Sequence, residues 1–213
     1  MNKMGLMQWI LRASQAARSR RSLLFDNLVK RKMISRSGFP LRLLDVGGTE
    51  DYWHQVGSIG EEVMKITLLN LVPSPSRTSS MNSLACDARR LCFRDYEFDI
   101  VFSNSVIEHI DDHKRVADEI RRVGRAYWVQ TPNYYFPIEP HALLPFLQFF
   151  PPKARPYLVQ YFTPKERRGV KREILDIQLL KRRELESLFP EAQIWEEKMF
   201  GLTKSFVALS GWE

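Results

Sequence analysis

Residues 43–51 are Leu43-Leu44-Asp45-Val46-Gly47-Gly48-Thr49-Glu50-Asp51. The apolar run that begins at Leu41 and ends at Val46 is typical of a buried strand, and the acidic residues after the two glycines are typical of the first turn of a helix. Glycine lets a backbone approach a ligand closely and adopt angles that a Cβ forbids. The pattern therefore predicts a strand, a ligand-binding turn and a helix, with a purely structural strand-to-helix turn as the alternative.

Apolar runs and helical patterns alternate along the rest of the chain. Runs typical of strands cover residues 41–46, 63–69, 98–103 and 125–131, with a short one ending near Cys86. Helical patterns cover residues 50–59, 111–123 and 179–188, and two closing strands are predicted at 192–199 and 205–209. Residues 133–163 are rich in proline and aromatic residues, which indicates a loop-rich insertion after the fifth strand. This alternation predicts an α/β fold with a parallel sheet.

Basic residues are concentrated at the N-terminus. The chain has 213 residues and a formal net charge of +7, but residues 1–42 contain ten Lys or Arg and one acid, a net charge of +9 that leaves −2 for the rest. We therefore divide the chain into a basic helical N-terminal extension, residues 1–38, and one domain, residues 39–213. Three roles fit the extension: a solvated helix covering part of the domain, a contact surface for anionic lipid or RNA, or a targeting segment.

Two further features limit the class of protein. No segment has the run of about 20 apolar residues that crosses a bilayer, so we expect no membrane-spanning helix. Cys86 and Cys92 are too few for a disulfide framework and lack the spacing of a zinc site, and the sequence predicts no metal centre. We expect both cysteines to be small core residues of a cytoplasmic protein.

A nicotinamide dinucleotide is one candidate ligand for the glycine turn. That ligand needs a Gly-x-Gly-x-x-Gly run, which is incomplete here. Glu50 and Asp51 also put negative charge where a pyrophosphate would bind the helix N-terminus. These acids therefore disfavour the dinucleotide and favour a ligand that places no phosphate at this turn.

A second informative stretch is Phe98-Asp99-Ile100-Val101-Phe102-Ser103-Asn104-Ser105-Val106-Ile107-Glu108-His109-Ile110. Together with the glycine turn, it resembles the class I, Rossmann-like S-adenosylmethionine-dependent methyltransferases, in their methyltransferase-11-like branch. The resemblance covers about residues 41–131, and Gly47 matches the glycine motif of the family, whereas Thr49 and Asp51 stand where further glycines often lie. It implies a Rossmann-like, seven-stranded, mostly parallel sheet flanked by helices, S-adenosyl-L-methionine as cofactor, and methyl transfer.

The resemblance also implies cofactor contacts at successive strand ends. The candidates are Asp45, Gly47, Gly48 and Thr49 in the first turn, Asn70 and Leu71 at the ribose, Asp87 and Ala88 at the adenine, and Ser103 and Asn104 at the methionine part. An amide at Asn70 replaces the usual carboxylate and can bind ribose hydroxyls without charge assistance. Asp87 has an alternative role as the cap of a helix that begins at Ala88.

Two turns carry the candidate catalytic residues His141, His109 and Glu139. Glu139 and His141 lie in a proline-braced segment, where the carboxylate can orient the imidazole as a general base. His109 follows the fourth strand and has a pKa suited to the same task. The alternatives are a rigid aromatic cover with an incidental histidine, and a turn in which His109 simply pairs with Glu108.

The expected activity is methylation of a small-molecule, lipid-linked or sugar-linked acceptor, because residues 43–213 contain no nucleic-acid motif. An RNA-modifying or nucleic-acid-binding protein that uses the basic N-terminus is one alternative. A non-catalytic relative is another, and Thr49, Asp51 and Asn70 keep it open. The sequence identifies neither the acceptor nor the oligomeric state.

Overall fold

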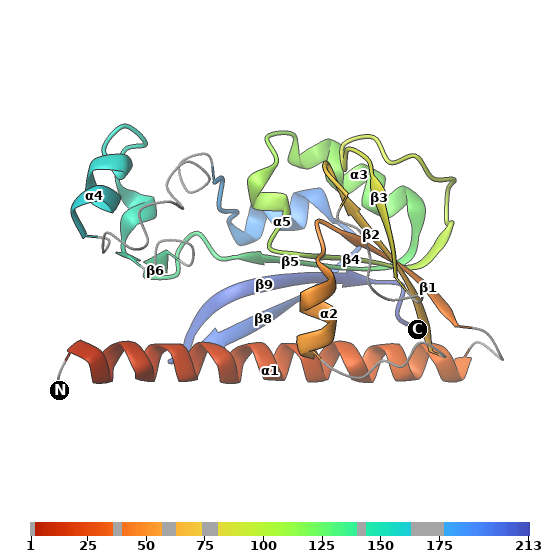
Figure 1. Ribbon diagram of the computed structural model, residues 1–213, viewed down its shortest axis with the longest axis horizontal. Helices are drawn as coiled ribbons and strands as arrows, with labels where there is room; N and C mark the ends of the chain where they lie inside the picture. The colour runs from red at the N-terminus through yellow and green to blue at the C-terminus, as the bar shows by residue number, and fades with distance from the viewer. Residues whose placement is uncertain (1–2, 36–39, 57–62, 74–80, 140–143, 163–176) are drawn as a thin grey trace.

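The computed structural model describes residues 3–35, 40–56, 63–73, 81–139, 144–162 and 177–213 (Figure 1). Its main feature is a seven-stranded sheet of order β3-β2-β1-β4-β5-β9-β8. The strands are β1 (Leu41–Val46), β2 (Met64–Asn70), β3 (Met81–Ala85), β4 (Phe98–Asn104), β5 (Gly124–Pro132), β8 (Gln193–Met199) and β9 (Leu202–Ser210). Strands β1 to β5 pair in parallel, and β9 is antiparallel to both neighbours. The predicted α/β class with a mostly parallel sheet is confirmed.

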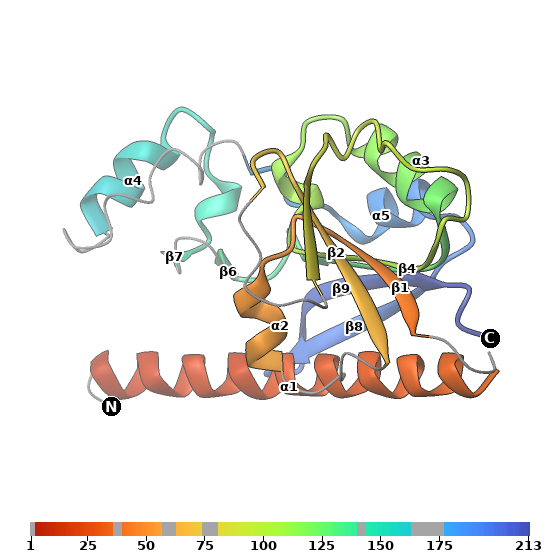
Figure 2. The ribbon, with the colours of Figure 1, turned by 45° about the vertical axis from the view of Figure 1, so that its right-hand side comes forward.

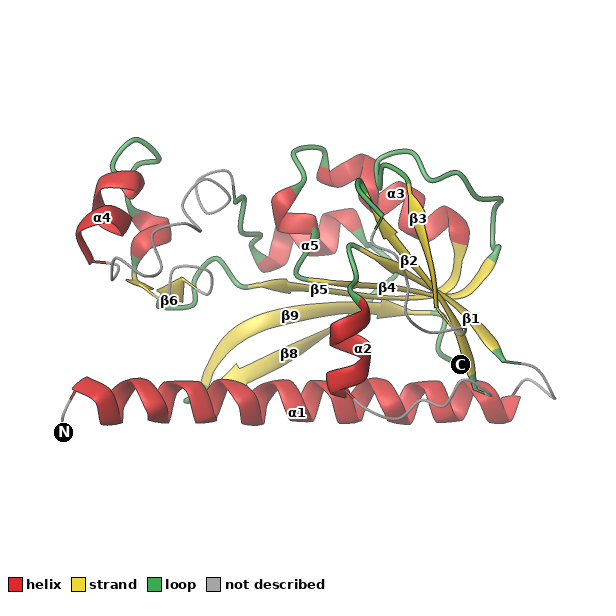
Figure 3. Cartoon of the chain, in the orientation of Figure 1, coloured by secondary structure: helices red, strands yellow, loops and turns green. Residues whose placement is uncertain are grey.

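Helices cover both faces of this sheet. The described helices are α1 (Lys3–Ser35), α2 (Glu50–Val56), α3 (His113–Val123), α4 (Arg155–Phe162) and α5 (Arg182–Leu188), with the single turns η1 (Ile107–His109) and η2 (Leu147–Phe149). Helix α4 and η2 lie beside β6 (Ile138–Glu139), apart from this sheet (Figure 1). Helices α1 and α2 lie on one face, and α3 and α5 on the other (Figure 3). Among the described residues, none of the helices is both long enough and apolar enough to cross a membrane.

Successive side chains of a strand point to opposite faces of the sheet, so each face has its own hydrophobic core. On β1, Leu41 and Leu43 pack toward α1 and α2, whereas Leu44 and Val46 pack toward α3 and α5. This is the period-2 pattern of a strand buried on both sides. Helices on both faces therefore explain why apolar residues occupy both sides of this strand.

Helix α1 extends along the molecule beneath the sheet (Figure 2). Ala17, Phe25 and Val29 on this helix are buried. The ring of Phe25 lies 4.9 Å from that of Phe102 and 5.4 Å from that of Trp128. The helical part of the basic N-terminal segment therefore shares a core with the sheet.

Some boundaries differ from those predicted. Strand β5 continues through Pro132, which pairs with Ser205 of β9. Strand β9 begins earlier than predicted, at Leu202, which pairs with Met199 of β8. Proline is tolerated there because β5 ends at that position. The predicted insertion contains short elements of its own: the β6 (Ile138–Glu139) and β7 (Leu144–Pro145) pair, η2 and α4.

The expectation that both cysteines are core residues was wrong for Cys92, which is exposed, while Cys86 is half-buried. Both follow β3, near the surface edge of the sheet, where Leu84 and Ala85 are also exposed. The edge strand has a neighbour on one side only, so residues beyond it are less covered.

Candidate functional site

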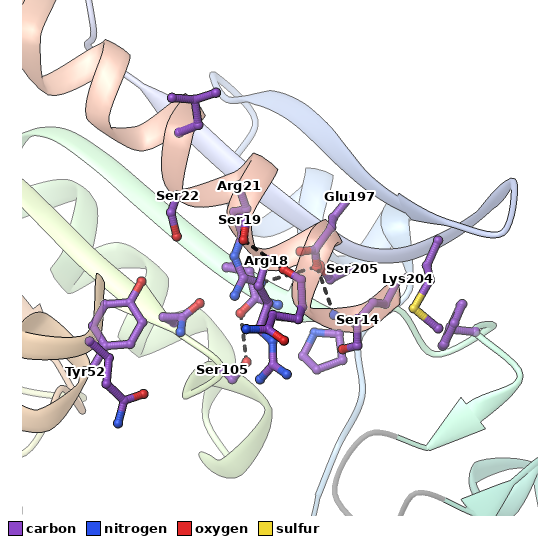
Figure 4. Close-up of a pocket in the computed structure, with 18 of the residues that line it drawn as sticks. Ser14, Arg18, Ser19, Arg21, Ser22, Tyr52, Ser105, Glu197, Lys204 and Ser205 are labelled. Carbon is purple, nitrogen blue, oxygen red and sulfur yellow. Dashed lines mark hydrogen bonds and ion pairs between the residues drawn. The ribbon is translucent and has the colours of Figure 1, made fainter. Parts of the chain in front are cut away.

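A cavity of about 940 Å³, here called the α1 cavity, lies between α1 and the carboxyl ends of β4 and β5 (Figure 4). The carboxyl ends of strands in open α/β sheets are where ligands bind. Its described lining residues include Ser14, Arg18, Arg21 and Asp26 of α1, Tyr52 and Gln55 of α2, Asn104, Ser105, Gln130 and Pro132 at the ends of β4 and β5, and Glu197, Lys204 and Ser205 of β8 and β9.

The α1 cavity is polar because the facing residues of β4 and of α1 change from apolar to polar at the same height along the sheet. On β4, Ile100 and Phe102 belong to the core between α1 and the sheet, and Asn104, the next residue on that face, lines the cavity. On α1, Phe25 belongs to the same core, whereas Arg18, two turns earlier, lines the cavity. Helix α1 and strand β4 therefore pack tightly around Phe25 and Phe102, and they enclose a polar space beyond Asn104 and Arg18.

The glycine turn after β1 contacts the turn after β4. Gly47 has φ +77°, and a Cβ there would lie 2.5 Å from Cγ2 of Val106. A Cβ on Gly48 would lie 1.7 Å from Oδ2 of Asp45. Both positions require glycine, because an added methyl group would overlap a neighbouring side chain. The turn is thus held against the segment that contains Ser105 and lines the cavity.

Asp45 joins the end of β1 to α2. Its carboxylate is buried and accepts a hydrogen bond of 2.7 Å from Nε1 of Trp53. Burial raises the pKa of Asp45 to about 7, although the Trp53 hydrogen bond opposes this shift. The neighbouring Tyr52 lines the cavity, and burial raises its pKa to about 12. Asp45 therefore positions the helix that carries Tyr52.

The turn after β4 is strained and polar. Ser105 has φ +58°, a region that non-glycine residues adopt where surrounding contacts enforce it. Its Oγ donates to Oε1 of Gln130 at 2.7 Å, and its backbone N–H donates to the Gln130 carbonyl at 3.0 Å. Oδ1 of Asn104 is buried, with no hydrogen-bond partner among the described residues. This acceptor can receive a hydrogen bond from a ligand in the cavity.

A buried charged cluster forms the wall at β8 and β9. Oε2 of Glu197 lies 3.4 Å from Nη1 of Arg21 and 3.5 Å from Nζ of Lys204, and it accepts a hydrogen bond from the Ser205 hydroxyl. The Glu197 side chain is only 1% exposed. Burial lowers the pKa of Lys204, against the attraction of Glu197, and the nearby Arg21 and Arg18 lower it further.

Residues 44–126 match the family described as methyltransferase domain. They include the glycine turn, the turn after β4 and the parallel part of the sheet that leads to the cavity. The chain has the class I methyltransferase fold.

Solved structures share this methyltransferase fold at low sequence identity. The CurJ carbon methyltransferase superposes with a TM-score of 0.52 at 10% identity, over 82% of this chain and 49% of that one. Phosphoethanolamine N-methyltransferase 2 of Haemonchus contortus, in complex with S-adenosyl-L-methionine, gives 0.51 at 16% identity, over 83% and 38%. The trans-methyltransferase CalH, in complex with SAH, gives 0.50 at 12% identity, over 80% and 51%.

The curated relatives share a shorter stretch. An uncharacterized protein of Mycobacterium tuberculosis (strain H37Rv) is 43% identical over 51 residues, which are 22% of this chain and 17% of the relative. A second strain, CDC 1551, has a protein with the same values. The chain therefore spans less than a fifth of the length of the curated relatives that it matches.

Five of the ten candidate cofactor residues lie around the glycine turn. Nδ2 of Asn70, at the end of β2, donates to the Gly48 carbonyl at 2.8 Å and so supports the turn. Thr49 is exposed, and its Oγ1 accepts a 3.4 Å hydrogen bond from the backbone N–H of Tyr52. Leu71 is 75% exposed. The structure brings Asp45, Gly47, Gly48, Thr49 and Asn70 together at one edge of the sheet.

Asp87 and Ala88 follow β3 in a turn, and no helix begins there. The Asp87 carboxylate accepts hydrogen bonds from the Arg89 backbone at 2.9 Å and from its guanidinium at 2.8 and 3.1 Å, which lowers the pKa of Asp87. Arg89 also donates to Asp111 at 3.0 Å. Ala88 is buried in the core below α3, as is Ser103 in the sheet. Asp87 therefore caps a turn with a local ion pair.

The candidate catalytic residues are not gathered in the α1 cavity. His109 is exposed on η1, while the preceding Glu108 is fully buried and accepts a 3.1 Å hydrogen bond from Oγ1 of Thr131. Glu139 is buried and lines a separate cavity of about 240 Å³ beside Gln148 and Arg155. His141 lies outside the described residues.

Several cavity residues were missed in the sequence. Arg18 and Arg21 belong to a segment that we interpreted as an extension, and Glu197 and Lys204 belong to closing strands without a motif. The available signal was the four-residue spacing of Ala17, Arg21, Phe25 and Val29, the spacing of one helix face. That spacing indicates a packed helix despite its basic composition.

Proposed function

We propose that this protein is an S-adenosylmethionine-dependent methyltransferase whose acceptor enters the α1 cavity. One observation carries the proposal: the glycine turn and the turn after β4, the two segments that resemble the family, touch each other, and the second of them lines a cavity of about 940 Å³. Cavities that hold small ligands have about 300–1,000 Å³. The family match of residues 44–126 supports the same conclusion.

The residues present fit the cofactor. Gly47 and Gly48 let the turn pack closely against Val106 and Asp45, which fixes its backbone at the end of β1. The buried Oδ1 of Asn104 can accept a hydrogen bond from an ammonium group. Asn70 is at the strand end where ribose hydroxyls bind in the family, and its Oδ1 is the atom that can accept from them. Leu71, Asp87 and Ala88 would border the adenosine, and for Asp87 this requires sharing the carboxylate with Arg89.

The cofactor supplies an activated methyl group, so the task of the protein is to align the acceptor with it and exclude water. Tyr52, Ser105 and Gln130 line the cavity and can orient an acceptor through hydrogen bonds. No histidine is among the described residues that line the α1 cavity. From the sequence alone, where it follows Glu139 and Pro140, His141 remains our proposed base for a hydroxyl acceptor. His109, which we expected as a pocket residue, does not line the α1 cavity.

The acceptor that we propose is a small molecule or the polar part of a lipid-linked or sugar-linked molecule. The polar lining of the cavity supports an acceptor rich in hydrogen-bonding groups. We also propose that the protein acts in the cytoplasm.

Calorimetry on the full chain with S-adenosylmethionine, S-adenosylhomocysteine and NAD tests the proposal. We expect micromolar binding of the first two ligands and none of NAD. The Gly47→Ala variant should lose that binding, while Gly201→Ala, which has the same φ of +77° but no atom within 4 Å of an added Cβ, should keep it. Binding of NAD alone, or equal binding by both variants, would contradict the proposed cofactor site.

A further inference from the structure

Cations outnumber carboxylates at the β8–β9 end of the α1 cavity. Arg18, Arg21 and Lys204 line it there together with one buried carboxylate, Glu197 (Figure 4). Arg21 and Lys204 both lie within 3.5 Å of the same oxygen, Oε2 of Glu197. The described lining of the whole cavity holds one further carboxylate, Asp26 of α1, so three cations face two carboxylates and the partly enclosed space keeps an excess of positive charge.

Two of the three cations are largely shielded from solvent, so water screens their positive charge little. The side chains of Arg21 and Lys204 are only 10% and 16% exposed. The pKa of Lys204 is lowered first by burial, and Arg18 and Arg21 contribute further repulsion. Charges that are close together and poorly hydrated gain most from an added anion, because the effective dielectric constant around them is low.

The same cluster contains a buried acceptor atom. Oε2 of Glu197 is engaged by Arg21, Lys204 and Ser205, whereas Oε1 is buried without a hydrogen-bond partner among the described residues. Buried carboxylate oxygens are nearly always hydrogen-bonded in folded proteins. A hydroxyl or ammonium group of a ligand in the cavity can satisfy it.

We propose that this end of the α1 cavity is a subsite for an anionic group, a carboxylate or a phosphate, of the methyl acceptor, bound by Arg18 and Lys204. Arg21 holds Glu197 in place, and Oε1 of Glu197 accepts a hydrogen bond from a donor on the same molecule. The acceptor is therefore an anionic molecule that also carries a hydroxyl or amino group. Calling the ligand the acceptor rests on the proposed methyltransferase function; the anion subsite itself does not.

Titration of the full chain with inorganic phosphate and with malonate, each with and without saturating S-adenosylhomocysteine, tests the subsite. Saturable one-to-one binding of at least one of these anions, with a Kd on the order of 1 mM, is expected under both conditions. Arg18→Gln and Lys204→Gln should each weaken it at least tenfold. Arg18 is exposed, so that variant should fold normally. Lys198→Gln, an exposed lysine of β8 outside the cavity lining, is the matched control and should bind like the wild type.

Three outcomes would overturn the subsite: no saturable binding of either anion, equal weakening in the Lys198→Gln control, or loss of binding once S-adenosylhomocysteine is present. The last outcome would assign the cations to the carboxylate of the cofactor. Anion binding without any binding of S-adenosylhomocysteine would leave the subsite standing and would contradict the proposed methyltransferase function. The relative strength of phosphate and malonate binding identifies which anionic group the subsite prefers.

Discussion

Asp45 combines full burial with a position at the end of β1. Burial raises its pKa to about 7 in the folded state, well above the ordinary value of 3.8. Between these two values the folded protein binds more protons than the unfolded chain, so Asp45 makes stability fall as pH rises from 4 to 7. The whole effect is on the order of 4 kcal/mol.

We predict that Asp45→Asn removes this pH dependence. The amide oxygen can still accept the hydrogen bond from Trp53, so the variant should become more stable relative to the wild type as pH rises from 4 to 7. Urea unfolding at several pH values measures the difference. Asp51→Asn, which removes an exposed carboxylate of α2, is the control for loss of charge. Parallel stability profiles for Asp45→Asn and the wild type would show that the carboxyl titrates normally in the fold.

Gly47 and Gly201 share a φ of +77° but differ in their surroundings. Gly201→Ala should cost about 1 kcal/mol, the usual cost of a side chain in this conformation. Gly47→Ala adds the overlap with Val106 and should cost about 2–4 kcal/mol in total. Denaturant unfolding measures both, and the double variant Gly47→Ala/Val106→Ala should recover part of the loss. A cost for Gly47→Ala no greater than that for Gly201→Ala would show that the two turns are not in contact.

At the scale of elements, the packing of the apolar face of α1 on the sheet predicts how substitutions on this helix change stability. Phe25 is 3% exposed and packs against Phe102 and Trp128. Phe25→Ala should therefore lower the free energy of unfolding by about 3–5 kcal/mol. Ile34→Ala, on the same helix but at a position 85% exposed, should change it by less than about 0.5 kcal/mol. Equal effects of the two substitutions in denaturant titrations would show that α1 does not pack on the sheet.

The central part of the sheet could be predicted from the sequence because strands such as β1, β4 and β5 are buried on both faces. The segment from Leu41 to Val46 is mostly apolar, with only Arg42 and Asp45 charged, and β1 has the predicted bounds. The packing of α1 could not be predicted from composition, because Arg12, Arg20, Lys30 and Arg31 dominate its charge while a few residues on the other face make the contacts.

Site residues were harder to predict where they depend on tertiary contacts. The sequence placed Asp45 at the end of a strand, but its bond to Trp53 depends on how α2 folds back. Arg18 and Lys204 are 186 positions apart, and they meet only because β9 inserts between β5 and β8 beside α1. Asp87 illustrates a local case: the helix that it was expected to cap does not form, and its carboxylate binds Arg89, two residues away, in a turn.

For the whole molecule, the concentration of positive charge on α1 predicts which surface binds large anionic partners. At about 100° per residue, Arg20 and Arg31 lie on one line along α1, with Arg12 and Lys30 roughly 80° away. All four are exposed, and Phe25 and Val29 lie on the opposite side of the helix. The buried face of α1 thus holds the helix on the sheet, while its basic strip faces solvent. We propose that this strip contacts anionic lipid or RNA.

The last prediction is therefore a salt-dependent association that involves the strip and spares the cofactor site. Full-length protein should bind vesicles containing phosphatidylserine, or single-stranded RNA, at low salt, and lose binding as the ionic strength approaches 1 M, because the attraction is screened. Arg20→Gln/Arg31→Gln should weaken it at least tenfold while leaving S-adenosylhomocysteine affinity unchanged. Lys114→Gln/Arg115→Gln removes two exposed cations from α3, on the other face of the sheet, and should have little effect. Sedimentation with vesicles and fluorescence anisotropy with RNA separate the two partners. If neither binds at low salt, or if both double variants bind equally, the strip is only the solvated side of a packed helix.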